Sequence, residues 1–180
     1  YSDAREAAEL LRNSLGEFDP HQRARWHQMR GACIWHLDGG AAAAEDFLRA
    51  AELCQDEDKF LAAGVRGKLL RGDFEGAIAS GEVALQRFPG SLSVWLATTN
   101  ARIARGDPIR LDDVPPDLRA EADALQMLAW SHGRQGDKPG AARISLEALE
   151  AKDANFFTRE QAIALCLDMV AADGVNATFR

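Results

Sequence analysis

The sequence has little of what builds disulfide frameworks, membrane spans or nucleic-acid-binding surfaces. It contains three cysteines, an odd number without a C-x-x-C pair, so neither a disulfide framework nor a thiolate zinc site is indicated. No apolar run approaches the ~20 residues that a membrane-spanning helix needs, so we predict no membrane insertion. The formal net charge of -7 argues against general nucleic-acid binding, because that binding depends on clustered Lys and Arg.

Catalytic and ligand-binding motifs are also scarce. The four histidines are His21, His27, His36 and His132, and no two of them form an i, i+4 pair or an H-E-x-x-H pattern. Cys33 and His36 would be neighbours on a helix, but a Cys–His pair at this spacing occurs easily by chance. No G-x-S-x-G elbow and no glycine-rich phosphate loop is present. The acidic stretch Gln55-Asp56-Glu57-Asp58 lacks the alternating ligands of a calcium loop and suits a helix N-terminus better. We predict no enzyme activity, no metal and no cofactor.

What the sequence does contain is helical periodicity. Hydrophobic residues make up 47% of the chain, and Ala, Leu, Glu and Arg recur at spacings of three and four residues. Prolines interrupt the pattern at 107–116, where we expect a loop or a very short helix. The chain is therefore predicted to be all-α with about nine helices, over residues 3–15, 20–38, 40–54, 57–71, 73–88, 91–105, 117–135, 137–152 and 158–172.

Small residues recur along these helices with a fixed period. Glycines separated by 30 to 34 residues fall between successive helical patterns, at Gly39, Gly72, Gly106 and Gly136. Alanines follow three of these glycines at five residues and again seven residues later, at Ala44, Ala77 and Ala141, and at Ala51, Ala84 and Ala148. Two small residues seven apart lie on one face of a helix, where they allow a neighbouring helix to approach closely. The spacing predicts repeated helical hairpins.

One unit carries enough landmarks to suggest a family. Residues 61–89 contain Gly72-Asp73-Phe74-Glu75-Gly76-Ala77, then Ala84-Leu85 and Pro89, and this unit resembles the tetratricopeptide repeat family. Gly136-Asp137-Lys138-Pro139-Gly140-Ala141 repeats the turn, although Gln28 stands where the family favours a large apolar residue. The resemblance covers most of residues 25–155 and implies a right-handed superhelical array of antiparallel helix pairs. We expect one such domain over 1–180, as a fragment of a longer protein, because both ends fall within a repeat.

The resemblance also implies a binding groove, since in this family the first helix of each pair lines the concave surface. The residues it places there are Trp26, Met29, Cys33, His36, Lys59, Arg66, Leu96, Asn100, Gln126 and Trp130. Arg66 and Asn100 would hydrogen-bond the backbone or a carboxylate of an extended peptide, and the two tryptophans would supply apolar anchors. The alternative is that the tryptophans pack in the core and Arg66 pairs with a neighbouring acid.

The leading functional hypothesis is a protein-interaction scaffold that binds a peptide or partner domain in this groove. Ala62 and Ala63 occupy places where chaperone-binding relatives carry clamp residues, which disfavours a cochaperone. Two alternatives remain: a noncatalytic helical segment of a larger enzyme or regulator, and self-association into a homo-oligomer through the array ends. Free cysteines favour the cytoplasm, unless a targeting segment lies outside these residues.

Overall fold

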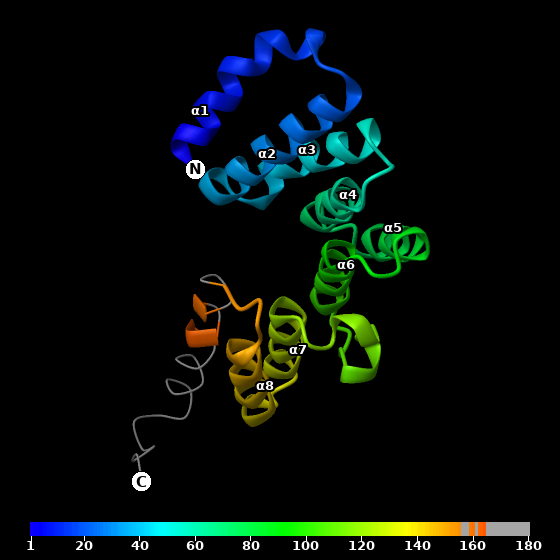
Figure 1. Ribbon diagram of the computed structural model, residues 1–180, viewed down its shortest axis with the longest axis vertical. Coiled ribbons are helices and arrows are strands. Elements are labelled where there is room, and N and C mark those ends of the chain that lie inside the picture. Colours follow the sequence, from blue (N-terminus) through cyan, green and yellow to red (C-terminus); the bar gives the residue numbers. More distant parts are fainter. Residues whose placement is uncertain (156–158, 161, 165–180) are drawn as a thin grey trace. The chain divides into compact units, whose positions relative to one another are not determined.

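The computed structural model describes residues 1–155, 159, 160 and 162–164, and this part of the chain contains helices and no strand (Figure 1). The prediction of an all-α protein is confirmed. The predicted helix over 158–172 lies largely outside the described residues. The described helices are α1 (Ser2–Leu10), η1 (Leu11–Glu17), α2 (Pro20–Asp38), α3 (Gly40–Leu53), α4 (Asp58–Leu70), α5 (Phe74–Arg87), α6 (Leu92–Arg105), η2 (Leu111–Asp113), η3 (Pro116–Leu118), α7 (Ala122–Arg134) and α8 (Lys138–Glu150).

Two boundaries differ from the sequence prediction by more than two residues. The first α-helix ends at Leu10 and continues as the 3-10 helix η1, a segment in which Asn13, Ser14 and Gly16 have low α-helix propensity. The helix predicted to begin at 117 begins instead at Ala122, whose backbone N–H donates to the Asp153 carboxylate at 3.0 and 3.1 Å. The irregular segment predicted over 107–116 is confirmed: it contains the short 3-10 helix η2, and η3 begins at its last residue.

The chain groups into two compact units, Tyr1–Arg105 and Gly106–Arg180. The first unit contains α1 to α6, and the second begins at the proline-rich irregular segment and contains α7 and α8. Sequence reasoning expected one repeat domain over the whole chain, and that the two units form one domain stays a prediction.

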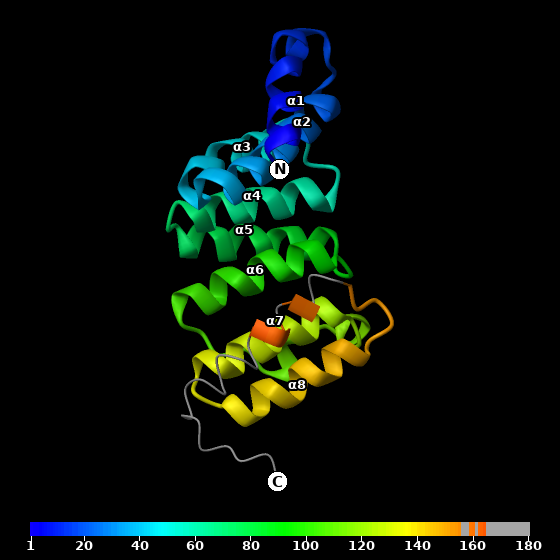
Figure 2. The ribbon, with the colours of Figure 1, turned by 90° about the vertical axis from the view of Figure 1, so that its left-hand side faces the viewer.

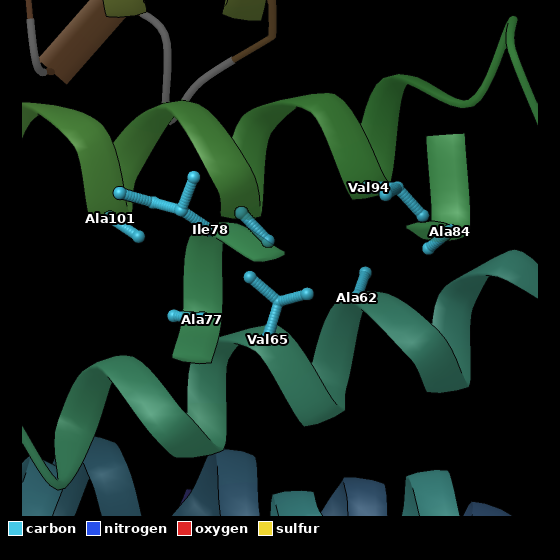
Figure 3. Packing of buried hydrophobic residues seen from close by; sticks show 8 residues of the cluster. Ala62, Val65, Ala77, Ile78, Ala84, Val94 and Ala101 are labelled. Atoms are coloured by element: carbon cyan, nitrogen blue, oxygen red, sulfur yellow. The ribbon is translucent and has the colours of Figure 1, made fainter. Parts of the chain in front are cut away.

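The core of the first unit is built from small and branched side chains between α4, α5 and α6. Val65, Ile78 and Val94 come from the three helices and meet in one buried cluster (Figure 3). Figure 2 shows these helices packed side by side. The packing is so close that a Cβ atom added at Gly81 would lie 2.0 Å from Oγ1 of Thr98, on the neighbouring helix. Small residues are therefore required where the helices touch.

The turn between α4 and α5 explains four landmarks of its motif, namely Gly72, Asp73, Gly76 and Ala77. Gly72 has a φ of 78°, a conformation that favours glycine. The Asp73 carboxylate caps α5 by accepting from the Gly76 N–H at 2.9 Å. A Cβ at Gly76 would lie 2.1 Å from that carboxylate, so the cap itself excludes a side chain there. Ala77 follows, fully buried against the neighbouring helices.

The same chemistry recurs between α7 and α8 in the second unit. Gly136 has a φ of 85°, Asp137 accepts from the Gly140 N–H at 3.0 Å, and Ala141 is fully buried. The remaining two periodic glycines, Gly39 and Gly106, also have positive φ values of 98° and 108°. The hairpin turns predicted at Gly39, Gly72 and Gly136 are confirmed, whereas Gly106 ends α6 and leads into the irregular segment instead of a second helix.

The helix predicted over 20–38 is also confirmed, and Asp19 caps it. Its carboxylate accepts from the Gln22 N–H at 2.7 Å, and the Gln22 side chain accepts from the Asp19 N–H at 3.0 Å, which forms a reciprocal capping box. Pro20 occupies the first helical position, where its missing N–H costs nothing.

Candidate partner-binding face

The candidate site lies in the first unit, where α4 packs between α2 and α6. On one side of α4, Ala62 shares a cluster with Val94 and Ala97 of α6. On the other side, Ala63 shares a cluster with Ala43 and Phe47 of α3, against which Ala32 and Ile34 of α2 pack. Lys59 and Arg66, two partly exposed residues of α4, belong to neither cluster. We call the exposed side of α2, α4 and α6 at this position the α2–α4–α6 face.

Lys59 and Arg66 project from α4 on this face, seven residues and therefore two helical turns apart. Lys59 already has a partner, because its Nζ lies 2.5 Å from the Glu57 carboxylate. The backbone carbonyl of Lys59 also accepts from the Gln28 side chain at 3.3 Å, which ties α4 to α2.

Arg66 is in a different situation. Its guanidinium carbon lies 5.4 Å from the ring centroid of Trp35 on α2 and 5.6 Å from that of Phe47 on α3, and the residue is partly buried. Within the described residues its side chain has neither a hydrogen bond nor an ion pair. Burial lowers the pKa of Arg66 below its ordinary value, although the group stays protonated at neutral pH. The aromatic rings hold this cation in place without neutralising it.

The acid beside Phe47 in the sequence cannot serve Arg66. Asp46 is only 2% exposed, and its carboxylate is bound by His27 Nδ1 at 2.7 Å and by two nitrogens of Arg30 at 2.8 Å each. Burial alone would raise the pKa of Asp46, but the hydrogen bonds and charges of these two partners together lower it. Sequence reasoning singled out neither this carboxylate nor Arg30. The alternative that Arg66 pairs with a neighbouring acid finds no such acid among the described residues.

Other predicted groove residues complete the face at its two edges. Met29 of α2 is 54% exposed, and His36, two turns further along α2, stacks on Tyr1 with ring centroids 4.0 Å apart. On α6, Leu96 and Asn100 are partly buried, and the Asn100 amide has no hydrogen-bond partner in the part of the chain that the structure describes. The face therefore combines apolar surface with polar groups that are free to bind.

Trp26 does not contribute to this face, which corrects the expectation of an exposed anchor. It is 6% exposed and its Nε1–H donates to the backbone carbonyl of Ala8 at 2.8 Å, so it fastens α1 to α2. Cys33 is buried on the same helix. For Trp26, the alternative of core packing is correct, because Trp is seldom left exposed when a partner helix covers it.

The last two predicted groove residues lie on α7 in the second unit. Gln126 is 6% exposed, and its Oε1 accepts no hydrogen bond from any described residue. Trp130 is 37% exposed.

Trp35 is the residue of the face that sequence reasoning missed. It is 38% exposed and lies beside Arg66, yet the two are 31 positions apart in the sequence. The only available signal was its place near the end of the helix before Gly39. Nothing local predicts that its ring would meet an arginine of the next helix pair.

No cluster of three or more His, Cys, Asp or Glu side chains that could hold a metal ion occurs among the described residues. Among the same residues, no helix is both long and apolar enough to cross a membrane. In comparisons with known proteins, no protein-family model matches this chain, and no curated protein matches it significantly.

Proposed function

We propose that this chain is a tetratricopeptide-like scaffold that binds an extended segment of a partner protein on the α2–α4–α6 face, without catalysis of its own. The observation that carries the proposal is Arg66, a partly buried cation with no acidic partner among the described residues, next to the exposed ring of Trp35. Burying a charge without a partner lowers stability, so a residue of this kind is more often kept for binding than for folding.

The repeated hairpin chemistry supports the architecture of the proposal. The turns before α5 and α8 share a positive-φ glycine, an aspartate cap, a glycine that admits the cap and a buried alanine. Stacked repeats of this kind expose the side chains of alternate helices along one surface, which suits the binding of an elongated ligand. A right-handed superhelix of such pairs is the arrangement that we infer.

The test uses two exposed apolar residues of similar character. Met29 lies on the proposed face and is 54% exposed, whereas Val83 lies on α5 and is 63% exposed. Proteins captured from an extract of the source organism are quantified with the native chain, with Met29→Asp and with Val83→Asp as bait. We expect Met29→Asp to lose a partner that Val83→Asp retains. Equal capture by both variants would place binding elsewhere, and no specific capture by the native chain would refute the scaffold.

Self-association is a second candidate, and one observation favours it. At the junction of α1 and η1, Leu10 is 75% exposed and Leu11 is 48% exposed, which leaves two adjacent apolar side chains in water. A second copy of the chain packing on this end would cover them. Sedimentation velocity over a range of protein concentrations tests this candidate. A concentration-dependent mass that disappears in Leu10→Glu supports it, and a constant monomer mass refutes it.

A further inference from the structure

We infer that Arg66 binds a carboxylate of the partner segment and that this contact makes the face selective for acidic sequences. The inference rests on the proposed function, because it takes the α2–α4–α6 face as the binding surface. It adds the chemical class of the group that is recognised and the residue that recognises it.

The side chain of Arg66 is positioned before any ligand arrives. Its guanidinium lies 5.4 Å from the Trp35 centroid and 5.6 Å from the Phe47 centroid, and these two rings come from different helices. An arginine has five N–H donors in a planar fork that matches the two oxygens of a carboxylate. Within the described residues these donors have no acceptor. The Arg66 side chain is therefore already ordered in the free protein, so binding a ligand costs less conformational entropy.

The surroundings favour a carboxylate over a phosphate group. A phosphate ester carries nearly two negative charges at neutral pH and is typically bound by more than one cation. The other cation of α4 on this face, Lys59, is engaged by Glu57 at 2.5 Å. One guanidinium without an acidic partner matches one singly charged anion.

Trp35 indicates which kind of ligand residue should lie next to the carboxylate. Its ring is 38% exposed and supports the Arg66 guanidinium from one side. Aromatic surface in this position binds an apolar side chain and also excludes water from the ion pair, which strengthens the pair. The expected ligand is a carboxylate next to an apolar residue. The carboxylate belongs either to an Asp or Glu side chain or to the chain terminus.

The experiment begins with a display library of random peptides selected on the full 180-residue chain. Enriched peptides are synthesised in three forms: unchanged, with each acidic residue replaced by its amide, and with an amidated C-terminus. Their affinities are measured for the native chain, for Arg66→Gln and for Lys59→Gln. The two variants remove one positive charge each from the same helix face, but only the first removes the charge that has no partner.

We expect the native chain to prefer the acidic form by about tenfold or more, the scale of one charge-assisted bidentate contact. Arg66→Gln should lose that preference while still binding the amide form, and Lys59→Gln should keep it. The two amide forms of the peptide identify the source of the carboxylate. Loss of the preference with the side-chain amide indicates Asp or Glu, and loss with the amidated C-terminus indicates the chain terminus.

The unfavourable outcomes separate the two proposals. If peptides are enriched but Arg66→Gln retains the acid preference, or if the enriched peptides carry no selective acid, the inference is overturned while the scaffold function stands. If no peptide is enriched over an unrelated helical bait, the proposed function fails and the inference fails with it. Circular dichroism of each variant confirms that the fold is retained before affinities are compared.

Discussion

Replacing Asp46 with Asn should destabilise the first unit. We expect a larger effect than from any other Asp→Asn or Glu→Gln substitution in that unit. The carboxylate is 2% exposed and accepts from His27 at 2.7 Å and from Arg30 at 2.8 Å twice. An amide of the same size cannot neutralise Arg30, and its NH₂ group would face donors. Breaking a buried ion pair costs roughly 3 to 5 kcal/mol. Arg30 keeps a contact with Glu9 at 3.7 Å, so we expect the lower end, about 3 kcal/mol.

The pH dependence of this difference is a second part of the prediction. The folded pKa of Asp46 lies below the ordinary value of 3.8, because the two partners favour the charged form. A depressed pKa adds stability that is fully present above about pH 5 and is lost as the pH falls through 3.8 towards the folded pKa. The gap between the native chain and Asp46→Asn should therefore be constant at neutral pH and should shrink in acid.

Urea unfolding followed by far-ultraviolet circular dichroism measures both quantities, and thermal scans should show a fall in Tm of about 6 to 12 °C at pH 7. Asp38→Asn is the matched control. Its ion pair with Arg5 has a similar length, 2.7 Å, but both side chains are more than 40% exposed, at 45% and 44%. We expect less than about 1 kcal/mol from it. The reasoning is refuted if the two variants are equally stable at pH 7, or if their gap does not change between neutral pH and acid.

Substitutions at three further positions test the packing, the free cation and one helix cap, all by thermal or urea unfolding. Gly67→Ala should cost about 2 kcal/mol despite alanine's better helix propensity, because its Cβ would lie 2.9 Å from the Ala44 carbonyl oxygen; a stabilised variant would contradict this. Arg66→Met should be neutral or up to about 1 kcal/mol more stable, and a larger loss would reveal an acidic partner. Asp73→Ala should cost about 1 kcal/mol by freeing the Gly76 N–H, and Asp73→Asn should recover most of it.

The helical fold and its turns follow from local chemistry, and the sequence predicted them well. Apolar and small residues at helical spacing indicate which face of a segment is buried, and a glycine between two such segments indicates where φ becomes positive. Gly72 and Gly136 satisfy this rule, and the helix predicted over 20–38 begins directly after its capping residue Asp19. Each of these features depends on residues within one or two turns of one another, so the sequence alone contains the necessary information.

The candidate site depended on tertiary structure. Trp26 and Trp35 are nine positions apart on one helix, yet the first is buried beneath α1 and the second is exposed beside Arg66. The start of α7 is likewise set by Asp153, a residue distant in the sequence. Contacts of this kind join residues of different helices. The spacing of residues within one helix does not tell which residues of another helix they will meet. The family resemblance predicted that Arg66 lies on the groove side of its helix. Only the packing of α2 and α3 around it decided that it meets two aromatic rings and no acid among the described residues.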